Sequence, residues 1–338
     1  MKKKSIFVIY TGGTIGMQRS EHGYITVSGY LQRQLAIMPE FYRPEMPDFT
    51  IYEYQPLMDS SDMTPEDWQH IADDIKAHYE DYDSFVILHG TDTMAFTASA
   101  LSFILGGLSK PVIVTGSQIP LSELRSDGQT NLLNALYIAA NYAINEVTLF
   151  FNKHLYRGNR TTKAHANGFN AFTSPNLSPL LEAGINIRYL GIPPAPHSNT
   201  DVIVHPIVPQ PIGVVTIYPG ISAEVVRNFL QQPVKALILR SYGLGNAPQN
   251  NKLLNELQQA SLRGIIVVNL TQCMFGKVNM SSYVTGNMLA HVGVISGFDM
   301  TVEATLTKLH YLLSQGLDID IVRTTMQQNL RGELTPDD

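Results

Sequence analysis

Cysteine is almost absent from this sequence of 338 residues, in which Cys273 is the only one. A single cysteine cannot form an intrachain disulfide, so nothing indicates an oxidising compartment. Apolar runs of about 20 residues are also missing, which excludes a transmembrane helix. The apolar run at residues 6–10 is too short for a signal peptide, and a glycine-rich turn ends it. We therefore predict a cytoplasmic protein without a membrane partner.

Basic patches and metal-binding motifs are scarce as well. The 23 Lys and Arg residues face 29 Asp and Glu residues, for a net charge of −6, and the only basic run is residues 2–4. This balance gives no electrostatic reason to expect a nucleic-acid partner. No H-E-x-x-H motif or histidine pair with metal-ligand spacing is present, so we expect no metal and no cofactor. The 44% hydrophobic content is typical of a packed globular protein that acts on a small molecule.

Short β-branched runs alternate with longer helical patterns in the first half. The runs are apolar enough for strands buried on both faces. The pattern Thr64–Tyr82 starts with a capping threonine, a proline and an aspartate at the capping-box position. We expect strands at Ser5–Thr11, Phe49–Tyr54, Ser84–Gly90, Pro111–Ser117 and Glu146–Asn152, and further helices at Met94–Leu108 and Asp127–Asn141. This alternation predicts an α/β fold with a mostly parallel sheet covered by helices.

A proline-rich passage predicts the division into domains. Six prolines lie between Ile192 and Ile212, which is typical of an extended linker. We predict an N-terminal α/β catalytic domain at 1–190, a linker at 191–212 and a smaller C-terminal α/β domain at 213–338. The last domain should contain strands at Ile212–Tyr218, Ala236–Tyr242 and Gly264–Thr271, and helices at Ala223–Leu230, Asn250–Arg263, Thr301–Ser314 and Asp318–Leu330. Residues 17–47 are predicted to form a mobile loop.

Polar residues follow several of the predicted strands. In open parallel sheets, ligands bind beyond the carboxyl ends of the strands. These ends carry T-G-G-T-I-G at 11–16, H-G-T-D-T at 89–93 and T-G-S-Q at 115–118, while D-S-S-D at 59–62 precedes a helix. Hydroxyls and carboxylates dominate, which suits covalent acyl chemistry on a polar zwitterion.

Each motif alone also has a simpler interpretation. The glycine-rich turn could bind a nucleotide, but it lacks both the G-x-G-x-x-G spacing and a Walker lysine. Thr91 or Asp92 could simply cap a helix, worth about 1 kcal/mol. His89 is expected to be a packed histidine and Cys273 a small buried group. The functional interpretation rests on the recurrence of such residues at successive strand ends.

Together these segments resemble the bacterial-type asparaginase/glutaminase family. The segments at 11–16 and 89–93 are similar to its two signature motifs, and R-G-N-R-T-T-K at 157–163 is similar to the segment with its active-site lysine. The likeness covers the whole chain and is greatest to cytoplasmic, type I members. It implies a flavodoxin-like parallel-sheet N-terminal domain and a homo-oligomer, either a dimer or a dimer of dimers (a homotetramer).

The resemblance also implies an activity and residue roles. The chain would be an L-asparagine amidohydrolase that releases L-aspartate and ammonia. Thr14 would attack the amide carbon and form an acyl-enzyme, and Tyr24 would close over the substrate and help to activate Thr14. Thr91, Asp92 and Lys163 would form a second cluster that activates water or shares the first step.

The D-S-S-D segment is implied to bind the substrate. Ser60 and the backbone of residues 59–61 would hold the α-carboxylate, and Asp92 would hold the α-ammonium. The full substrate-binding set implied is Asp59, Ser60, Ser61, Thr91 and Asp92. Extracellular members usually have glutamine where this sequence has Ser61. The acid that those enzymes take from a neighbouring subunit has Glu303 as its candidate here.

The implied roles are chemically reasonable. A threonine hydroxyl needs a neighbouring base to act as a nucleophile. Burial would lower the pKa of Lys163 and favour it as that base, whereas pairing with Asp92 would act in the opposite direction.

Three rival functions remain open. A glutaminase-asparaginase of broader specificity differs by one substrate methylene, worth about 1–3 kcal/mol. For an amidotransferase subunit acting on charged tRNA we would expect an additional N-terminal domain. A catalytically silent amino-acid sensor would need neither the nucleophile nor the lysine.

Type I members are also associated with activation by asparagine bound away from the catalytic site. Candidate residues for such an allosteric site follow two predicted strands of the C-terminal domain: Arg240, Thr271, Gln272 and Cys273. Arg240 could bind a carboxylate through its forked guanidinium group. Alternatively, Arg240 pairs with an acid at a domain or subunit contact.

Overall fold

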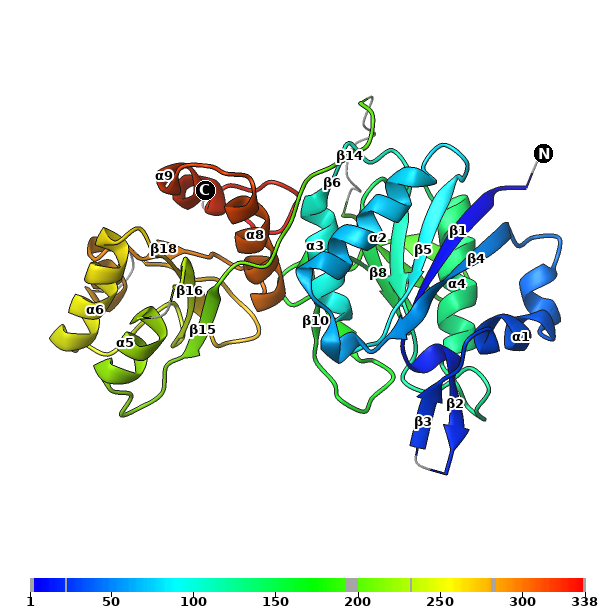
Figure 1. Cartoon of the computed structure of the whole chain (residues 1–338), viewed down its shortest axis with the longest axis horizontal. Coiled ribbons are helices and arrows are strands. Elements are labelled where there is room, and N and C mark those ends of the chain that lie inside the picture. Colours follow the sequence, from blue (N-terminus) through cyan, green and yellow to red (C-terminus); the bar gives the residue numbers. More distant parts are fainter. Residues whose placement is uncertain (1–2, 22, 193–199, 232, 281–283, 337–338) are drawn as a thin grey trace. The chain divides into compact units, whose positions relative to one another are not determined.

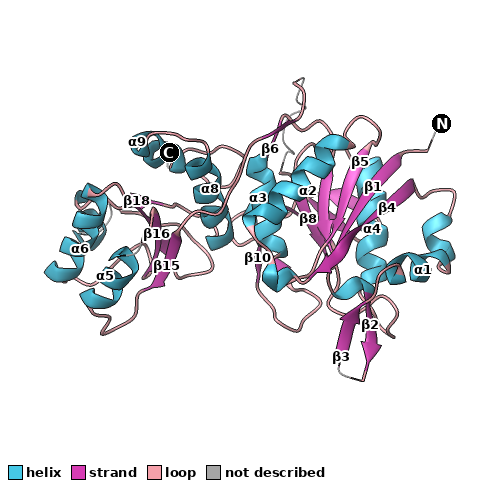
Figure 2. Ribbon diagram, in the orientation of Figure 1, coloured by secondary structure: helices cyan, strands magenta, loops and turns pink. Residues whose placement is uncertain are grey.

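The computed structural model describes residues 3–21, 23–192, 200–231, 233–280 and 284–336. The backbone divides into two compact units, Met1–His205 and Pro206–Asp338, which we describe separately. Figure 1 traces the chain through both units and Figure 2 distinguishes helices from strands.

The predicted linker, residues 191–212, contributes to both units. Residues 193–199 lie outside the described residues. Strand β14 (Ile203–Val204) pairs with β6 (Leu105–Gly106) in the first unit. The prolines from position 206 onwards belong to the second unit.

The first unit contains an eight-stranded sheet with the order β13-β12-β9-β8-β7-β5-β1-β4. Five neighbouring strands, β4, β1, β5, β7 and β8, are parallel to one another. Strands β9, β12 and β13 extend the sheet in antiparallel pairs. In chain order the parallel strands lie 2-1-3-4-5, which is the flavodoxin-like order, so the predicted fold class is confirmed. The bounds are β1 (Ser5–Gly12), β4 (Asp48–Met58), β5 (Ser84–Leu88), β7 (Val112–Thr115), β8 (Val147–Phe151), β9 (His154–Arg157), β12 (Leu181–Ala183) and β13 (Ile187–Tyr189).

Helices cover both faces of this sheet (Figure 2), because its central strands are apolar on both sides. On one face, Val8 packs in a core cluster with Leu31 and Leu132. On the other face, Phe7 stacks on His78 with 4.1 Å between ring centroids. The helices of this unit are α1 (Tyr30–Ala36), α2 (Pro65–Ala77), α3 (Met94–Ile104) and α4 (Gly128–Asn141).

Helix α2 begins as predicted but ends earlier. Its first turn has the capping box, in which the N–H and hydroxyl of Thr64 donate to the Asp67 carboxylate at 2.7 and 2.8 Å. The helix stops at Ala77 rather than Tyr82, and Lys110 Nζ donates to two backbone carbonyls in the turn that follows. Helix α3 also stops early, because residues 105–106 leave it to form β6.

The prediction of a mobile loop at residues 17–47 is wrong. This segment forms a hairpin of β2 (Met17–Ser20) and β3 (Gly23–Thr26), then helix α1 and a short 3-10 helix (Pro39–Tyr42). The hairpin strands are short and mostly exposed, so hydrophobic alternation could not reveal them. Leu31 and Leu35 are four residues apart and both buried, a helical spacing that the sequence did contain.

The second unit has a smaller parallel sheet in the order β15-β16-β17-β18. Helices α5 and α6 pack on one face and α8 and α9 on the other. The bounds are β15 (Ile212–Thr216), β16 (Ala236–Ser241), β17 (Ile266–Thr271), β18 (Ile295–Ser296), α5 (Ala223–Gln231), α6 (Asn251–Leu262), α7 (Val284–His291), α8 (Val302–Ser314) and α9 (Ile319–Met326). Strand β18 and helix α7 were not predicted.

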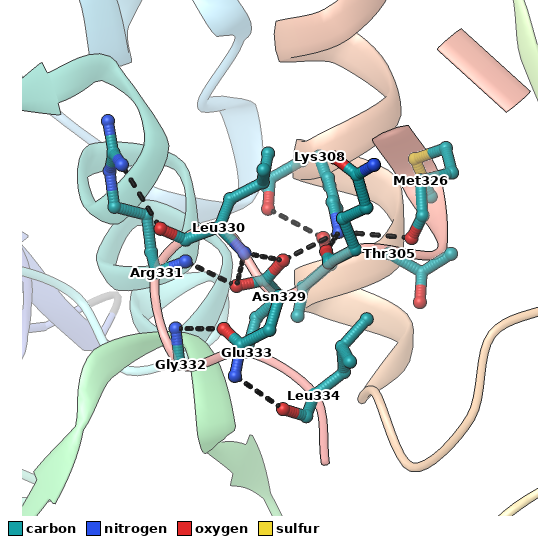
Figure 3. Close-up of polar contacts among 12 residues, drawn as sticks. Thr305, Lys308, Met326, Asn329, Leu330, Arg331, Gly332, Glu333 and Leu334 are labelled. Carbon is teal, nitrogen blue, oxygen red and sulfur yellow. Dashed lines mark hydrogen bonds and ion pairs between the residues drawn. The ribbon is translucent and has the colours of Figure 1, made fainter. Parts of the chain in front are cut away.

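A buried ion pair holds the C-terminal segment against α8 (Figure 3). Lys308 Nζ lies 2.6 Å from a carboxylate oxygen of Glu333, and both side chains are fully buried. Lys308 also donates to the carbonyls of Met326 and Gln328 at 3.0 and 2.5 Å. Burial lowers the pKa of Lys308, and Glu333 opposes that change. Lys308 therefore bonds carbonyls at and just after Met326, where α9 ends before the predicted Leu330.

Candidate active site

The loops at three strand ends of the first unit contact one another closely. A Cβ at Gly13 would lie 2.4 Å from the backbone nitrogen of Gly90, and a Cβ at Gly90 would lie 2.4 Å from Ser60 Oγ. Only glycine permits this approach. The turn after β1, the loop after β5 and the segment after β4 therefore meet at the carboxyl edge of the sheet, as the sequence predicts.

Thr14 opens a 3-10 turn, Thr14–Gly16, directly after β1. Its side chain is half-buried, while the next residue, Ile15, is buried in the core. The Ile15 carbonyl accepts a hydrogen bond from Leu121 N–H at 3.0 Å. The turn is therefore anchored to Leu121 and to the core, while the Thr14 side chain is only half-buried. Because Gly13 contacts Gly90, the neighbours of these glycines, Thr14 and Thr91, lie on adjoining loops.

Tyr24 lies on β3, in the hairpin that follows the Thr14 turn, where it pairs with Arg19. Its side chain is 47% exposed. The segment between β3 and α1 is held by Glu53 on β4, whose carboxylate accepts from the Ser28 hydroxyl at 2.7 Å and from Gly29 N–H at 2.8 Å. Closure of Tyr24 over a substrate stays a prediction.

Thr91, Asp92 and Lys163 form a hydrogen-bonded cluster, as expected. Lys163, on the short strand β10 (Thr162–Lys163), donates from Nζ to Thr91 Oγ1 at 2.9 Å. The same ammonium group pairs with Asp92 Oδ1 at 2.6 Å. Thr91 is buried, whereas the Asp92 side chain is 64% exposed. Asp92 can therefore face a ligand in solution while it pairs with Lys163.

The D-S-S-D segment forms a capped turn at the end of β4. The carboxylate of Asp59 accepts from the N–H and the hydroxyl of Ser61, both at 2.9 Å. Ser60 is buried, and its carbonyl accepts from the Thr93 hydroxyl at 2.6 Å. Ser60 is thus fixed beside the loop that carries Thr91, while Asp59 and Ser61 are exposed.

His89 is fully buried, in agreement with the expected packed histidine, and it bonds the loop that carries Thr91. Its Nδ1 donates to the Gly90 carbonyl at 2.7 Å, because a carbonyl can only accept. Nε2 then accepts from the Thr97 hydroxyl at 2.8 Å, and Trp68 Nε1 donates to that hydroxyl at 3.1 Å. Burial lowers the pKa of His89 from 6.5 to about 4, so the ring is neutral at pH 7.

Gln118, after β7, belongs to the same constellation but was not among the predicted site residues. Its Oε1 accepts from the Thr91 hydroxyl at 3.0 Å. The sequence offered a weak signal, since Gln118 closes the polar segment at the fourth strand end. An amide side chain has no motif of its own that would have distinguished it.

The residues considered for an allosteric site lie at adjacent strand ends of the second unit. Ser241 of β16 is paired with Thr271 of β17. Gln272 Nε2 donates to the carbonyls of Ile217 and Arg240 at 2.7 and 2.9 Å, so this amide group already holds the strands together.

Arg240 and Cys273 differ in exposure at these strand ends. In the described part of the chain, Arg240 Nε is buried and makes no hydrogen bond. Cys273 is exposed, not buried as expected, because it lies beyond the end of β17.

Glu303, the candidate for a shared acid, is a buried residue in the first turn of α8.

Neither a metal centre nor a membrane span is found among the described residues. No group of three or more His, Cys, Asp or Glu side chains there is arranged to hold a metal ion. None of the helices found there combines the length and apolar character needed to cross a membrane.

Comparison with known proteins identifies the family. Residues 5–194 match the family model "Asparaginase, N-terminal", and residues 211–326 match "Glutaminase/Asparaginase C-terminal domain". The chain belongs to the asparaginase family of enzymes. This confirms the resemblance found in the sequence motifs.

Individual relatives cover the whole chain. The chain is 81% identical over 338 residues to L-asparaginase 1 of Escherichia coli strain K12, with 100% of both chains covered. Its structure is similar to that of L-asparaginase I from Vibrio cholerae, with a TM-score of 0.93, 65% identity and coverage of 98% of this chain and 99% of that chain. For the thermostable L-asparaginase of Thermococcus kodakarensis the TM-score is 0.89, at 31% identity and coverage of 98% and 100%.

Proposed function

We propose that this enzyme hydrolyses the side-chain amide of L-asparagine to L-aspartate and ammonia through an acyl-enzyme on Thr14. The observation that supports it most is the adjoining position of two hydroxyl-bearing loops. One carries Thr14 on an anchored turn, and the other carries Thr91 hydrogen-bonded to Lys163. The high identity to L-asparaginase 1 of E. coli supports the choice of asparagine.

The first half of the reaction forms an ester. Thr14 Oγ attacks the amide carbon and loses its proton to a base, assisted by Tyr24. Backbone N–H groups of the converging loops stabilise the resulting oxyanion, at about 3 kcal/mol or more each. The C–N bond then breaks, the nitrogen takes a proton, and ammonia leaves a β-aspartyl ester on Thr14.

The second half returns Thr14 to its starting state. Water attacks the ester carbon, the C–O bond to Thr14 breaks, and the threonine oxygen takes back a proton. The cluster of Thr91, Asp92 and Lys163 handles the protons of water or shares in the first step. This cluster favours an enzyme over a silent sensor, because binding alone requires no lysine bonded to a threonine hydroxyl.

Substrate recognition uses the charged groups around the two loops. We assign the α-carboxylate to Ser60 and the backbone of residues 59–61, and the α-ammonium to the exposed carboxylate of Asp92. A site built on two charges rejects molecules that lack them, because its own polar groups would be left unpaired. Glutamine keeps both charges and differs by one methylene, so discrimination against it is about 1–3 kcal/mol.

An assay of ammonia release tests this mechanism. We expect Thr14→Ala and Thr91→Val each to lower the rate with asparagine by roughly 10³-fold or more. Near-normal rates in both variants would contradict the proposal. Equal kcat/KM values for asparagine and glutamine in the wild type would instead indicate a glutaminase-asparaginase of broader specificity.

We further propose that asparagine binds at the strand ends near Arg240 and activates the enzyme. The buried Nε of Arg240, which makes no hydrogen bond in the described part of the chain, supports this assignment. Arg240→Ala should remove any sigmoidal dependence of rate on asparagine while the saturated rate is kept. Arg227→Ala, which alters an exposed ion pair with Glu256 in the same unit, is the matched control. Unchanged sigmoidal behaviour in Arg240→Ala would reject the site.

Assembly and location are proposed on the same basis. We expect a dimer or a dimer of dimers, with Glu303 tested as an acid shared between subunits. The cytoplasm is the compartment that suits a chain with one exposed, unpaired cysteine. Sedimentation of the purified protein would measure the oligomeric state directly.

A further inference from the structure

Gln118 lies between the Thr91 cluster and an open pocket. The pocket has a volume of about 330 Å³ and is lined by Gln118, Ile119, Ala166, Asn167 and Phe169. Asp127 fixes the backbone of Gln118, because its carboxylate accepts from the N–H groups of Gln118 and Ile119 at 3.0 and 3.1 Å. Asp127 stands at the start of α4, so a helix of the scaffold fixes the position of Gln118.

The direction of the Gln118 amide follows from its partners. Nε2 lies 3.3 Å from the Ala166 carbonyl and 3.1 Å from the Gly168 carbonyl. Carbonyl oxygens only accept hydrogen bonds, so the NH₂ group must face them. The amide oxygen Oε1 therefore faces Thr91, and rotating the amide by half a turn would place an oxygen against both carbonyls.

The Thr91 hydroxyl has one proton, and its two neighbours determine where that proton points. Gln118 Oε1 can only accept, so Thr91 must donate to it, across 3.0 Å. Lys163 Nζ, 2.9 Å away on another side, then donates to a lone pair of the same hydroxyl. Thr91 is buried, which limits competition from water. A chain of defined donors and acceptors thus runs from the 166–168 backbone to Lys163.

We propose that Gln118 is a positioning residue that orients the Thr91 hydroxyl for turnover. Its amide oxygen holds the Thr91 proton away from Lys163 and keeps a lone pair of Thr91 directed at the lysine. A hydroxyl held in this way keeps Thr91 and the Lys163 ammonium group in one fixed arrangement before the reaction begins. This inference rests on the proposed role of Thr91 and Lys163 in the reaction.

The test compares steady-state kinetics with asparagine for several variants. Gln118→Met keeps the length of the side chain and removes the side-chain hydrogen bonds to Thr91, Ala166 and Gly168. We expect kcat to fall roughly 3- to 10-fold, the effect of one net hydrogen bond, with KM within about twofold of wild type. In a Thr91→Val background the same substitution should leave the residual rate unchanged, because the hydroxyl that it orients is gone.

Two further variants separate orientation from simple packing. Asn167→Ala alters the same pocket wall, and we expect it to keep wild-type kcat. Gln118→Glu keeps an oxygen toward Thr91 but repels the two carbonyls, and it serves if Gln118→Met does not fold. Its kcat should lie within about threefold of wild type, the lower end of one net hydrogen bond.

Several kinetic results would contradict the proposed role of Gln118, and one would contradict that of Thr91. Wild-type kcat in Gln118→Met, an equal loss in Asn167→Ala, or a loss that persists in the Thr91→Val background would overturn the inference. A larger fall in Gln118→Glu would do the same. A near-normal rate in Thr91→Val alone would instead refute the proposed role of Thr91, which is a separate failure.

Discussion

His89 should make the folded enzyme lose stability as the pH falls from about 6.5 to 4. The ring is fully buried, and burial lowers its pKa from 6.5 to about 4. Between these values the unfolded chain binds a proton that the folded chain does not, so stability rises with pH in this window and falls on acidification. At 1.36 kcal/mol per pH unit, the whole interval corresponds to roughly 3 kcal/mol at pH 4.

Denaturant unfolding at several pH values measures this contribution. Other groups titrate in the same range, so the informative quantity is the difference between wild type and His89→Gln. That difference should depend on pH below 6.5 and be constant above it. A flat difference for His89→Gln would refute a buried, neutral His89.

Two further predictions concern the scaffold. Lys308→Met should lower the free energy of unfolding by about 3–5 kcal/mol, because the buried Glu333 carboxylate keeps its backbone N–H partners but loses its cation. The double variant Lys308→Met with Glu333→Leu should recover only part of that loss in denaturant unfolding, because the N–H groups of Leu330 and Arg331 lose their acceptor. Equal losses in the two variants would contradict this prediction. Glu53→Ala should speed amide hydrogen exchange at the base of the β2–β3 hairpin and the start of α1, because it releases Ser28 and Gly29. Glu21→Ala, at an exposed residue between the two strands, is the control. Equal exchange in both variants would argue against the anchor.

The sequence predicts the central architecture well because the central strands have a strong local signal. Strands such as β5 are buried throughout and apolar at all but their first residue, and the capping pattern at Thr64 defines the start of α2. Polar segments at the ends of parallel strands must meet at one edge of the sheet. The union of the Thr14, Ser60 and Thr91 loops could therefore be expected from the order of strands and polar segments along the chain.

The features that escaped prediction depend on distant or weakly patterned residues. The hairpin that carries Tyr24 has four-residue strands and is held in part by Glu53, 29 positions beyond Tyr24 in the chain. The ion pair of Lys308 and Glu333 joins residues 25 positions apart. Gln118 reaches Thr91 only because β5 and β7 are neighbours in the sheet. No local periodicity encodes such contacts.

Mass analysis of the acid-quenched enzyme during turnover tests the central claim most directly. Lys163→Met should slow hydrolysis of the ester and allow the intermediate to accumulate. We predict that the peptide containing Thr14 gains the mass of one aspartyl group and that Thr14→Ala abolishes this adduct. An aspartyl adduct on the peptide containing Thr91, persisting in Thr14→Ala, would contradict the account.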